Sequence, residues 1–108
     1  MKSIVVAVRD VQSNGFIKPQ YFVTLEASMR AFEVAVTGGD PSMSEFPDDY
    51  SLYYLGTYDD ETGMHESDGP PKRVYTGFEA LSSAKRRRQK LEALNAEIAL
   101  LNGDGDAN

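Results

Sequence analysis

The sequence predicts an α+β fold, with a small, mainly antiparallel sheet, one helix packed on the sheet and a long C-terminal helix. Three observations favour this fold class. Residues 4–8 form an unbroken apolar run, and residues 50–58 alternate in the manner of a strand. Apolar side chains between Leu25 and Val36 recur at helical spacing.

The length of 108 residues fits one domain with a core of modest size. We expect a compact α+β domain at residues 1–80. A basic and amphipathic helix is predicted at residues 81–102, because charged residues and then regularly spaced apolar ones occupy this segment. The glycine- and aspartate-rich residues 103–108 are predicted to be a disordered tail.

The first half of the chain is expected to supply a central strand and a helix. Residues 2–9 are predicted to be the strand, since their apolar run is continuous. Thr24 is a suitable N-cap for the helix, which would end at the glycine pair 38–39. Its buried stripe would consist of Leu25, Met29, Phe32 and Val36. We expect loops at residues 11–19 and 40–49.

An aromatic strand is predicted at residues 50–58. Strict alternation divides its residues into two faces. They are Tyr50, Leu52, Tyr54, Gly56 and Tyr58 on one side, and Ser51, Tyr53, Leu55 and Thr57 on the other. Both faces carry large apolar groups, so we expect both to be covered at least in part, with Leu52 and Leu55 substantially buried. A turn at residues 59–63 and short strands at residues 64–66 and 73–75 would follow.

A capping box at Thr76 and Glu79 predicts the start of the long helix, which would run to about Leu101. About 25 helical residues would span about 38 Å. The helix carries a basic cluster, which consists of Lys85, Arg86, Arg87, Arg88 and Lys90. Successive helical residues are about 100° apart, so the cluster surrounds the helix. The helix should therefore project into solvent or onto a charged partner.

An apolar seam follows the basic cluster. It consists of Leu91, Leu94, Ile98 and Leu101. The spacing of these residues is that of two coiled-coil heptads, which predicts a homo-oligomer interface. Alternatively, the seam packs on its own domain. The basic cluster has its own alternatives: it is a solvated surface, or it neutralises the acidic residues 1–71 of the same molecule.

The net charge of −6 is unevenly distributed, with −8 in residues 1–71, +6 in residues 72–90 and −4 in residues 91–108. Overall acidity therefore does not exclude a nucleic-acid partner. Candidate nucleic-acid contacts are the basic cluster together with Arg73, Arg9 and Tyr53. The arginines could hold phosphates and the tyrosine ring could stack on an unpaired base. The alternatives are surface ion pairs for the arginines and core packing for the tyrosine.

Several other kinds of site are disfavoured. The chain has no cysteine, which excludes disulfides and thiolate metal sites, and one histidine, His65, which excludes a multi-histidine zinc site. The carboxylates at residues 59–68 do not have EF-hand spacing. No glycine-rich phosphate-binding motif occurs. We expect no catalytic residue, no metal and no cofactor. No run of about 18 apolar residues occurs, so we expect no membrane span.

Several segments together resemble a known family. The matching residues are Val8-Arg9-Asp10, Phe16, Pro19, Ala27, Arg30, Ala31, Phe32 and the string Pro47-x-Asp49-Tyr50-x-Leu52-Tyr53-x-Leu55-Gly56-Thr57-Tyr58-Asp59-Asp60-x-Thr62-Gly63. Over residues 1–80 the chain resembles the small nonstructural protein of gokushoviruses, the single-stranded-DNA bacteriophages of the Microviridae. The resemblance implies a viral protein made in the cytoplasm of the infected bacterial host, scarce or absent in the virion, and either DNA-binding or active in genome replication.

The resemblance and the candidate contacts lead to one favoured expectation. The protein would be non-enzymatic and would bind single-stranded DNA, independently of sequence, during viral genome replication. The alternative is a regulator of replication or capsid assembly that binds viral proteins through its C-terminal helix.

Overall fold

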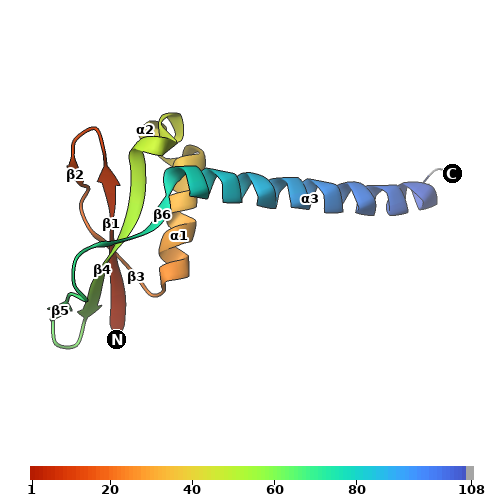
Figure 1. Cartoon of the computed structure of the whole chain (residues 1–108). Helices are drawn as coiled ribbons and strands as arrows, with labels where there is room; N and C mark the ends of the chain where they lie inside the picture. The colour runs from red at the N-terminus through yellow and green to blue at the C-terminus, as the bar shows by residue number, and fades with distance from the viewer. Residues whose placement is uncertain (107–108) are drawn as a thin grey trace.

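The computed structural model describes the backbone of residues 1–106 and the side chains of residues 1–102, and its architecture confirms the α+β fold class (Figure 1). The strands are β1 (Lys2–Asp10), β2 (Gly15–Phe16), β3 (Gln20–Phe22), β4 (Tyr50–Asp59), β5 (His65–Glu66) and β6 (Lys72–Thr76). The helices are α1 (Leu25–Val34), α2 (Pro41–Glu45) and α3 (Gly77–Asp106), with a π-helical turn at Ala35–Gly39 and a 3-10 turn at Pro47–Asp49.

The two long strands, β1 and β4, form the centre of an antiparallel sheet. Their pairing runs from Lys2 opposite Asp59 to Asp10 opposite Tyr50. The short strands β2 and β3 pair with the other edge of β1, and β5 and β6 pair with the other edge of β4. The central position of β1 explains why its apolar run is unbroken, since side chains on both of its faces are removed from water.

A β-bulge in β4 makes the predicted alternation wrong beyond Tyr54. Val5 lies opposite Gly56 and Val6 lies opposite Tyr54, so Leu55 has no partner in β1. A bulge adds one residue to one strand only, so the side chains that follow it change faces. Leu55 is half-buried and so largely removed from water as predicted, although less completely than Leu52, which is 3% exposed.

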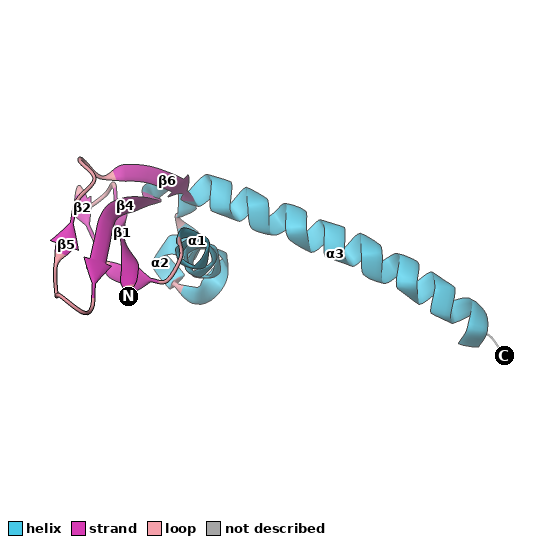
Figure 2. Cartoon of the chain, turned by 90° about the horizontal axis from the view of Figure 1, so that it is seen from below, coloured by secondary structure: helices cyan, strands magenta, loops and turns pink. Residues whose placement is uncertain are grey.

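The register defines two faces of the sheet. Residues directly opposite each other on neighbouring strands point to the same face. Leu52, opposite Val8, belongs to what we call the closed face, and Tyr53, opposite Ala7, belongs to the open face. After the bulge, Tyr58 joins the open face because it lies opposite Ser3. Figure 2 shows α1 and α2 together on one side of β1 and β4.

The hydrophobic core lies between the closed face and these helices. Its buried members are Val6, Phe32, Val36, Met43, Leu52, Tyr75 and Ala80. Thr24 caps α1 as predicted, because its hydroxyl oxygen accepts the Ala27 backbone N–H at 3.1 Å.

The expectation of a simple loop at residues 40–49 is wrong. The carboxylate of Asp40 accepts the backbone N–H groups of Ser42 and Met43, at 3.0 and 3.1 Å, and Pro41 occupies the first turn of α2. An aspartate N-cap followed by proline is a helix-start signal, which the short length of the helix obscured in the sequence. The result is that Met43 is brought into the core.

The capping box at the start of α3 is present. The Glu79 backbone N–H donates to the Thr76 hydroxyl at 3.0 Å, and the Thr76 backbone N–H donates to the Glu79 carboxylate at 3.1 Å. Ala80 is fully buried, but every residue at 85–102 is exposed. The helix therefore projects away from the sheet, as Figure 1 shows.

The projecting helix makes the molecule elongated. Its extents are 65 × 35 × 19 Å and its radius of gyration is 18.7 Å, compared with about 13 Å for a compact domain of this length. The helix continues to Asp106, past the end predicted near Leu101, and residues 107–108 of the predicted tail lie outside the described residues. Within residues 1–106, no helix has both the length and the apolar character needed to cross a membrane.

Candidate nucleic-acid interface

Three of the predicted contact residues come together on the open face. Arg9 lies on β1, Tyr53 on β4 and Arg73 on β6, and all three line one concave pocket of about 300 Å³. The remaining lining residues are Val11, Asp48, Ser51, Thr76 and Phe78. We call this hollow the open-face pocket. The three predicted contacts, up to 64 positions apart in the sequence, thus share one surface.

A second irregularity in the sheet places Arg73 in this pocket. Leu52 lies opposite Tyr75, whereas Tyr53 lies opposite Arg73, so Val74 is left without a partner in β4. Without this extra residue, Arg73 would share the closed face with Tyr75. The bulge therefore turns a basic side chain from the core side of the sheet to the open side.

Aromatic rings flank the open-face pocket. The rings of Phe16 and Tyr53 are 5.2 Å apart between centroids and meet edge to face at 82°. Phe16 is 48% exposed, and Phe78, at the start of α3, is also exposed. Neither phenylalanine was among the predicted contacts. A sequence feature that could have identified Phe16 is the Ser-Asn-Gly turn at residues 13–15. This turn folds β2 back onto β1 and places Phe16 opposite Arg9.

The charges of the open-face pocket are mixed, with a positive excess. The Arg9 guanidinium donates to the side-chain oxygen of Asn14 at 2.6 Å. Within the described residues, neither Arg9 nor Arg73 forms an ion pair. Asp48 is the one carboxylate that lines the pocket. Two guanidinium groups against one carboxylate favour an anionic ligand.

The opposite end of the open face is aromatic but acidic. The Tyr21 hydroxyl and His65 Nε2 are 2.8 Å apart, and the Tyr58 ring lies 4.6 Å from the His65 ring. The carboxylates of residues 59–61 gather around the N-terminal ammonium, with Asp60 at 2.7 Å. The Asp60 hydrogen bond raises the pKa of that ammonium. Phosphates should avoid this end, because the carboxylates of residues 59–61 and Glu66 outnumber the N-terminal ammonium and Lys2.

Within the basic cluster, Arg87 has a structural contact that the other members lack. Its guanidinium donates to the Glu33 carboxylate at 2.7 Å, and the Tyr75 hydroxyl donates to the other carboxylate oxygen at 2.6 Å. Burial alone would raise the pKa of Glu33, but the hydrogen bonds from Tyr75 and Arg87, with the charge of Arg87, hold it below the ordinary value of 4.5. These contacts join α1, β6 and α3.

The other four members of the basic cluster are free of such contacts. Lys85, Arg86, Arg88 and Lys90 are exposed, and none forms an ion pair within the described residues. The residues of the apolar seam are between 46% and 75% exposed. The sequence could not distinguish Arg87 from its neighbours, because its partner Glu33 is 54 positions away.

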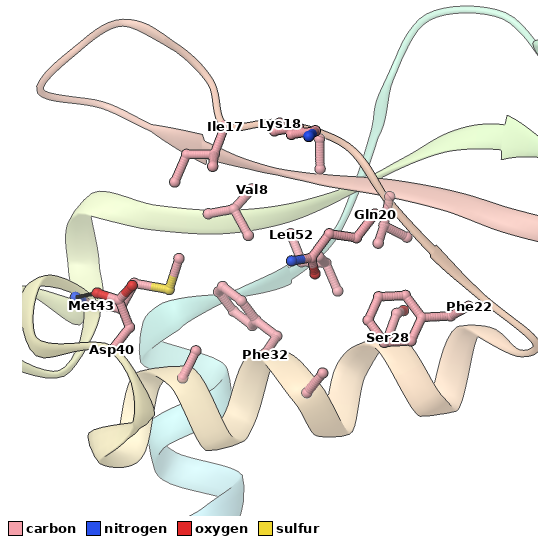
Figure 3. A pocket seen from close by; sticks show the side chains of 14 residues that line it. Val8, Ile17, Lys18, Gln20, Phe22, Ser28, Phe32, Asp40, Met43 and Leu52 are labelled. Atoms are coloured by element: carbon pink, nitrogen blue, oxygen red, sulfur yellow. Dashed lines mark hydrogen bonds between the residues drawn. The ribbon is translucent and has the colours of Figure 1, made fainter.

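A second cavity, of about 320 Å³, opens between α1 and β1 on the closed side (Figure 3). Phe32 and Ser28 reach into it from α1, while Ile17 and Lys18 lie across it. The Ser28 hydroxyl donates to the Leu25 carbonyl at 2.6 Å, so it does not need a ligand. In the described part of the chain, no buried side-chain polar atom lacks a partner. Most residues that line this cavity are apolar, although Lys18, Gln20 and Asp40 also line it, so it is mainly an opening of the core.

Comparison with known proteins gives one match. None of the curated proteins or solved structures that were compared is similar to the chain. The sequence model of one family, described as Phage ORF5 protein, matches residues 3–80. The match covers β1 to the start of α3, including the open-face pocket, and ends before the basic cluster. Since it spans more than half of the chain, this is a phage protein that belongs to the Phage ORF5 protein family.

Proposed function

We propose that this protein binds single-stranded DNA, independently of sequence and without enzymatic activity. The observation that carries this proposal is the open-face pocket, in which Tyr53 lies between Arg9 and Arg73 on a sheet face without a covering helix. The resemblance to gokushovirus nonstructural proteins supplies the setting, which is genome replication of a Microviridae phage in the cytoplasm of its bacterial host.

The pocket fits the chemistry of an unpaired nucleotide. Tyr53 and Phe16 offer aromatic surface for stacking, which is tolerant of sequence because every base has a π-face. The guanidinium groups of Arg9 and Arg73 can hold the flanking phosphates. A base in a duplex is stacked on both sides and paired along one edge, so it cannot enter a pocket of about 300 Å³. We therefore expect a preference for single strands over duplex.

The free members of the basic cluster would extend the contact. Lys85, Arg86, Arg88 and Lys90 can approach a second stretch of backbone without reading bases. Phe78 lines the pocket and lies in the first turn of α3, the helix that carries the basic cluster further along. Arg87 is expected to contribute less, because Glu33 already neutralises its charge.

The salt dependence of binding tests the proposal. Anisotropy titrations with labelled oligothymidine would be run from about 50 mM salt upwards. Arg9→Gln and Arg73→Gln should each weaken binding and flatten the log-log salt slope by about 0.7, the value for one phosphate contact on a single strand. Arg30→Gln on α1 is the matched control, since it removes the same charge from an exposed site outside the pocket. It should leave the slope unchanged.

Stacking is tested at Tyr53. Tyr53→Ala should weaken binding by about 1–3 kcal/mol, whereas Tyr53→Phe keeps the ring and should bind nearly as well as the wild type. Thermal unfolding of each variant would show that the fold persists. The proposal fails if the wild type does not bind at about 50 mM salt, or if Arg30→Gln has the same effect as Arg73→Gln.

The alternative function is a protein-binding regulator of replication or capsid assembly. The observation in its favour is the exposure of the apolar seam, which is unusual for a soluble helix. A viral protein captured by the wild type but not by the Leu94→Asp, Ile98→Asp double variant would support this function, provided that DNA binding is also absent.

A further inference from the structure

We propose that α3 pairs with α3 of a second copy in antiparallel orientation, so that Leu91 of each copy packs against Leu94 of the other. The proposal rests on the apolar seam and on the charges around it. It does not depend on DNA binding.

The projecting part of α3 lacks the packing that stabilises helices in proteins. Residues 85–102 are all exposed, and nothing in the described part of the chain covers the apolar seam. Isolated helices of this length are marginal in water unless an apolar face is buried. A row of four large aliphatic side chains on one face is the pattern that helix pairing buries.

The seam continues the face by which α3 contacts its own body. With Leu91 and Ile98 at heptad position a, and Leu94 and Leu101 at d, the same register places Ala84 at a and both Ala80 and Arg87 at d. Ala80 is fully buried against the core, and Arg87 contacts Glu33. A partner helix on this face would therefore run from the body to the end of the seam without a break.

Charge decides the orientation. Two parallel helices would place both basic clusters at the same level, with five cations on each helix and no carboxylate between them. From residue 91 onwards the chain carries four acidic residues and no basic ones. An antiparallel pair sets the basic cluster of each copy beside this acidic half of the other, which replaces repulsion by attraction.

Charge also selects the register of the two helices. Pairing Leu91 with Leu94 of the second copy brings Lys90 beside Glu97, both at heptad position g, where residues of antiparallel helices flank the seam. In the neighbouring register, with Leu94 against Ile98, Glu97 of one copy would face Glu97 of the other, and the two carboxylates would repel each other. The favoured register overlaps residues 84–101, about 27 Å of helix, and requires residues 102–106 of each copy to turn away from the face where Ala80 of the other copy is buried. In this register the Arg87 guanidinium stays on Glu33 of its own copy, while the aliphatic part of Arg87 packs beside Ile98 of the second copy.

Spin-label distances distinguish the two orientations. The chain has no cysteine, so Ala93→Cys and Asn102→Cys each introduce a single labelling site outside the apolar seam. In the proposed dimer, the two labels at residue 93 lie at nearly the same level, whereas the two at residue 102 are about 28 Å apart along the axis. Equal distances at the two sites would overturn the antiparallel orientation. Absence of dipolar coupling at hundreds of micromolar protein would overturn the dimer.

An exchange of charges provides the second test, read by sedimentation equilibrium. Lys90→Glu or Glu97→Lys alone should weaken the dimer about threefold to tenfold, because each turns two attractive contacts into repulsive ones. The double variant should recover the wild-type affinity. In a parallel pair Lys90 would face Asn95, so the double variant would show no recovery, which contradicts the proposal. Leu94→Asp with Ile98→Asp should give monomers that keep the sheet but lose helical circular dichroism signal, because the unpaired part of α3 is marginal in water.

Discussion

The two faces of the sheet are built from the same strands, β1 and β4, yet different structures cover them. Leu52 points into the closed face, where α1 and α2 lie over it, and is 3% exposed. Its neighbour Tyr53 points to the open face, where side chains of the sheet, Val11, Asp48 and the start of α3 surround it. One strand can therefore supply both the core and a binding surface, because consecutive residues point to different faces.

The largest expected effect tests the closed face. Leu52→Ala should lower the free energy of unfolding by about 2–4 kcal/mol, because it leaves a cavity in the centre of the core. Leu55→Ala should cost only about 1 kcal/mol, since the bulge leaves Leu55 half-buried. Urea denaturation of the two variants measures the difference. Equal losses would show that Leu55, in spite of the bulge, contributes as much to stability as Leu52.

A smaller loss of stability is expected at Gly56, beside the bulge where the side chains of β4 switch to the other face of the sheet. Gly56 has φ +149°, and a side chain there would clash with the Glu66 carbonyl oxygen. Gly56→Ala should therefore cost about 2–3 kcal/mol in the same assay, from strain and from displacement of β5.

Gly63→Ala is the matched control for Gly56. Its φ is +74°, but no atom lies within 4 Å of an added Cβ. Only the backbone strain remains, about 1 kcal/mol. Similar losses at the two glycines would mean that the approach of β5 to Gly56 does not contribute to stability.

Local signals predicted the elements of the fold. The apolar run of β1, the N-cap at Thr24 and the capping box at Thr76 depend on residues a few positions apart. The bulge at Leu55 was not predictable, because it is a property of the pairing between β4 and β1. Strand β3 was missed for a related reason, since its three residues are a strand only because β1 pairs with them.

The candidate site was predicted as separate residues, not as an arrangement. Arg9, Tyr53 and Arg73 were chosen for their chemistry, and the register shift at Val74 then brings them into one pocket. That shift is not visible in the sequence. The same limit applies to Arg87, whose ion pair with Glu33 joins two helices far apart along the chain. Side-chain chemistry identified the candidates, whereas their placement depended on long-range pairing.

The smallest expected effect concerns the polar contact that attaches α3 to the closed side. Glu33→Gln removes the charge that Arg87 contacts but keeps an oxygen for the Tyr75 hydroxyl. Glu33 is 8% exposed. However, the Arg87 side chain is 64% exposed and solvent screens the ion pair, so we expect a loss of about 1 kcal/mol at neutral pH.

The pH dependence of this loss identifies its cause. The pKa of Glu33 is lowered in the folded protein, so its contribution is fully present above the ordinary value of 4.5 and is lost as the pH falls through the lowered pKa. The difference between wild type and Glu33→Gln should therefore shrink below about pH 4.5. Asp59, whose pKa is also lowered, is present in both proteins and cancels in the difference. Glu45→Gln, at an exposed carboxylate of α2, is the control and should change the free energy of unfolding by less than about 0.5 kcal/mol. A difference for Glu33→Gln that stays constant from neutral pH to well below pH 4.5 would show that packing, rather than the charge on Glu33, attaches α3 to the sheet and α1.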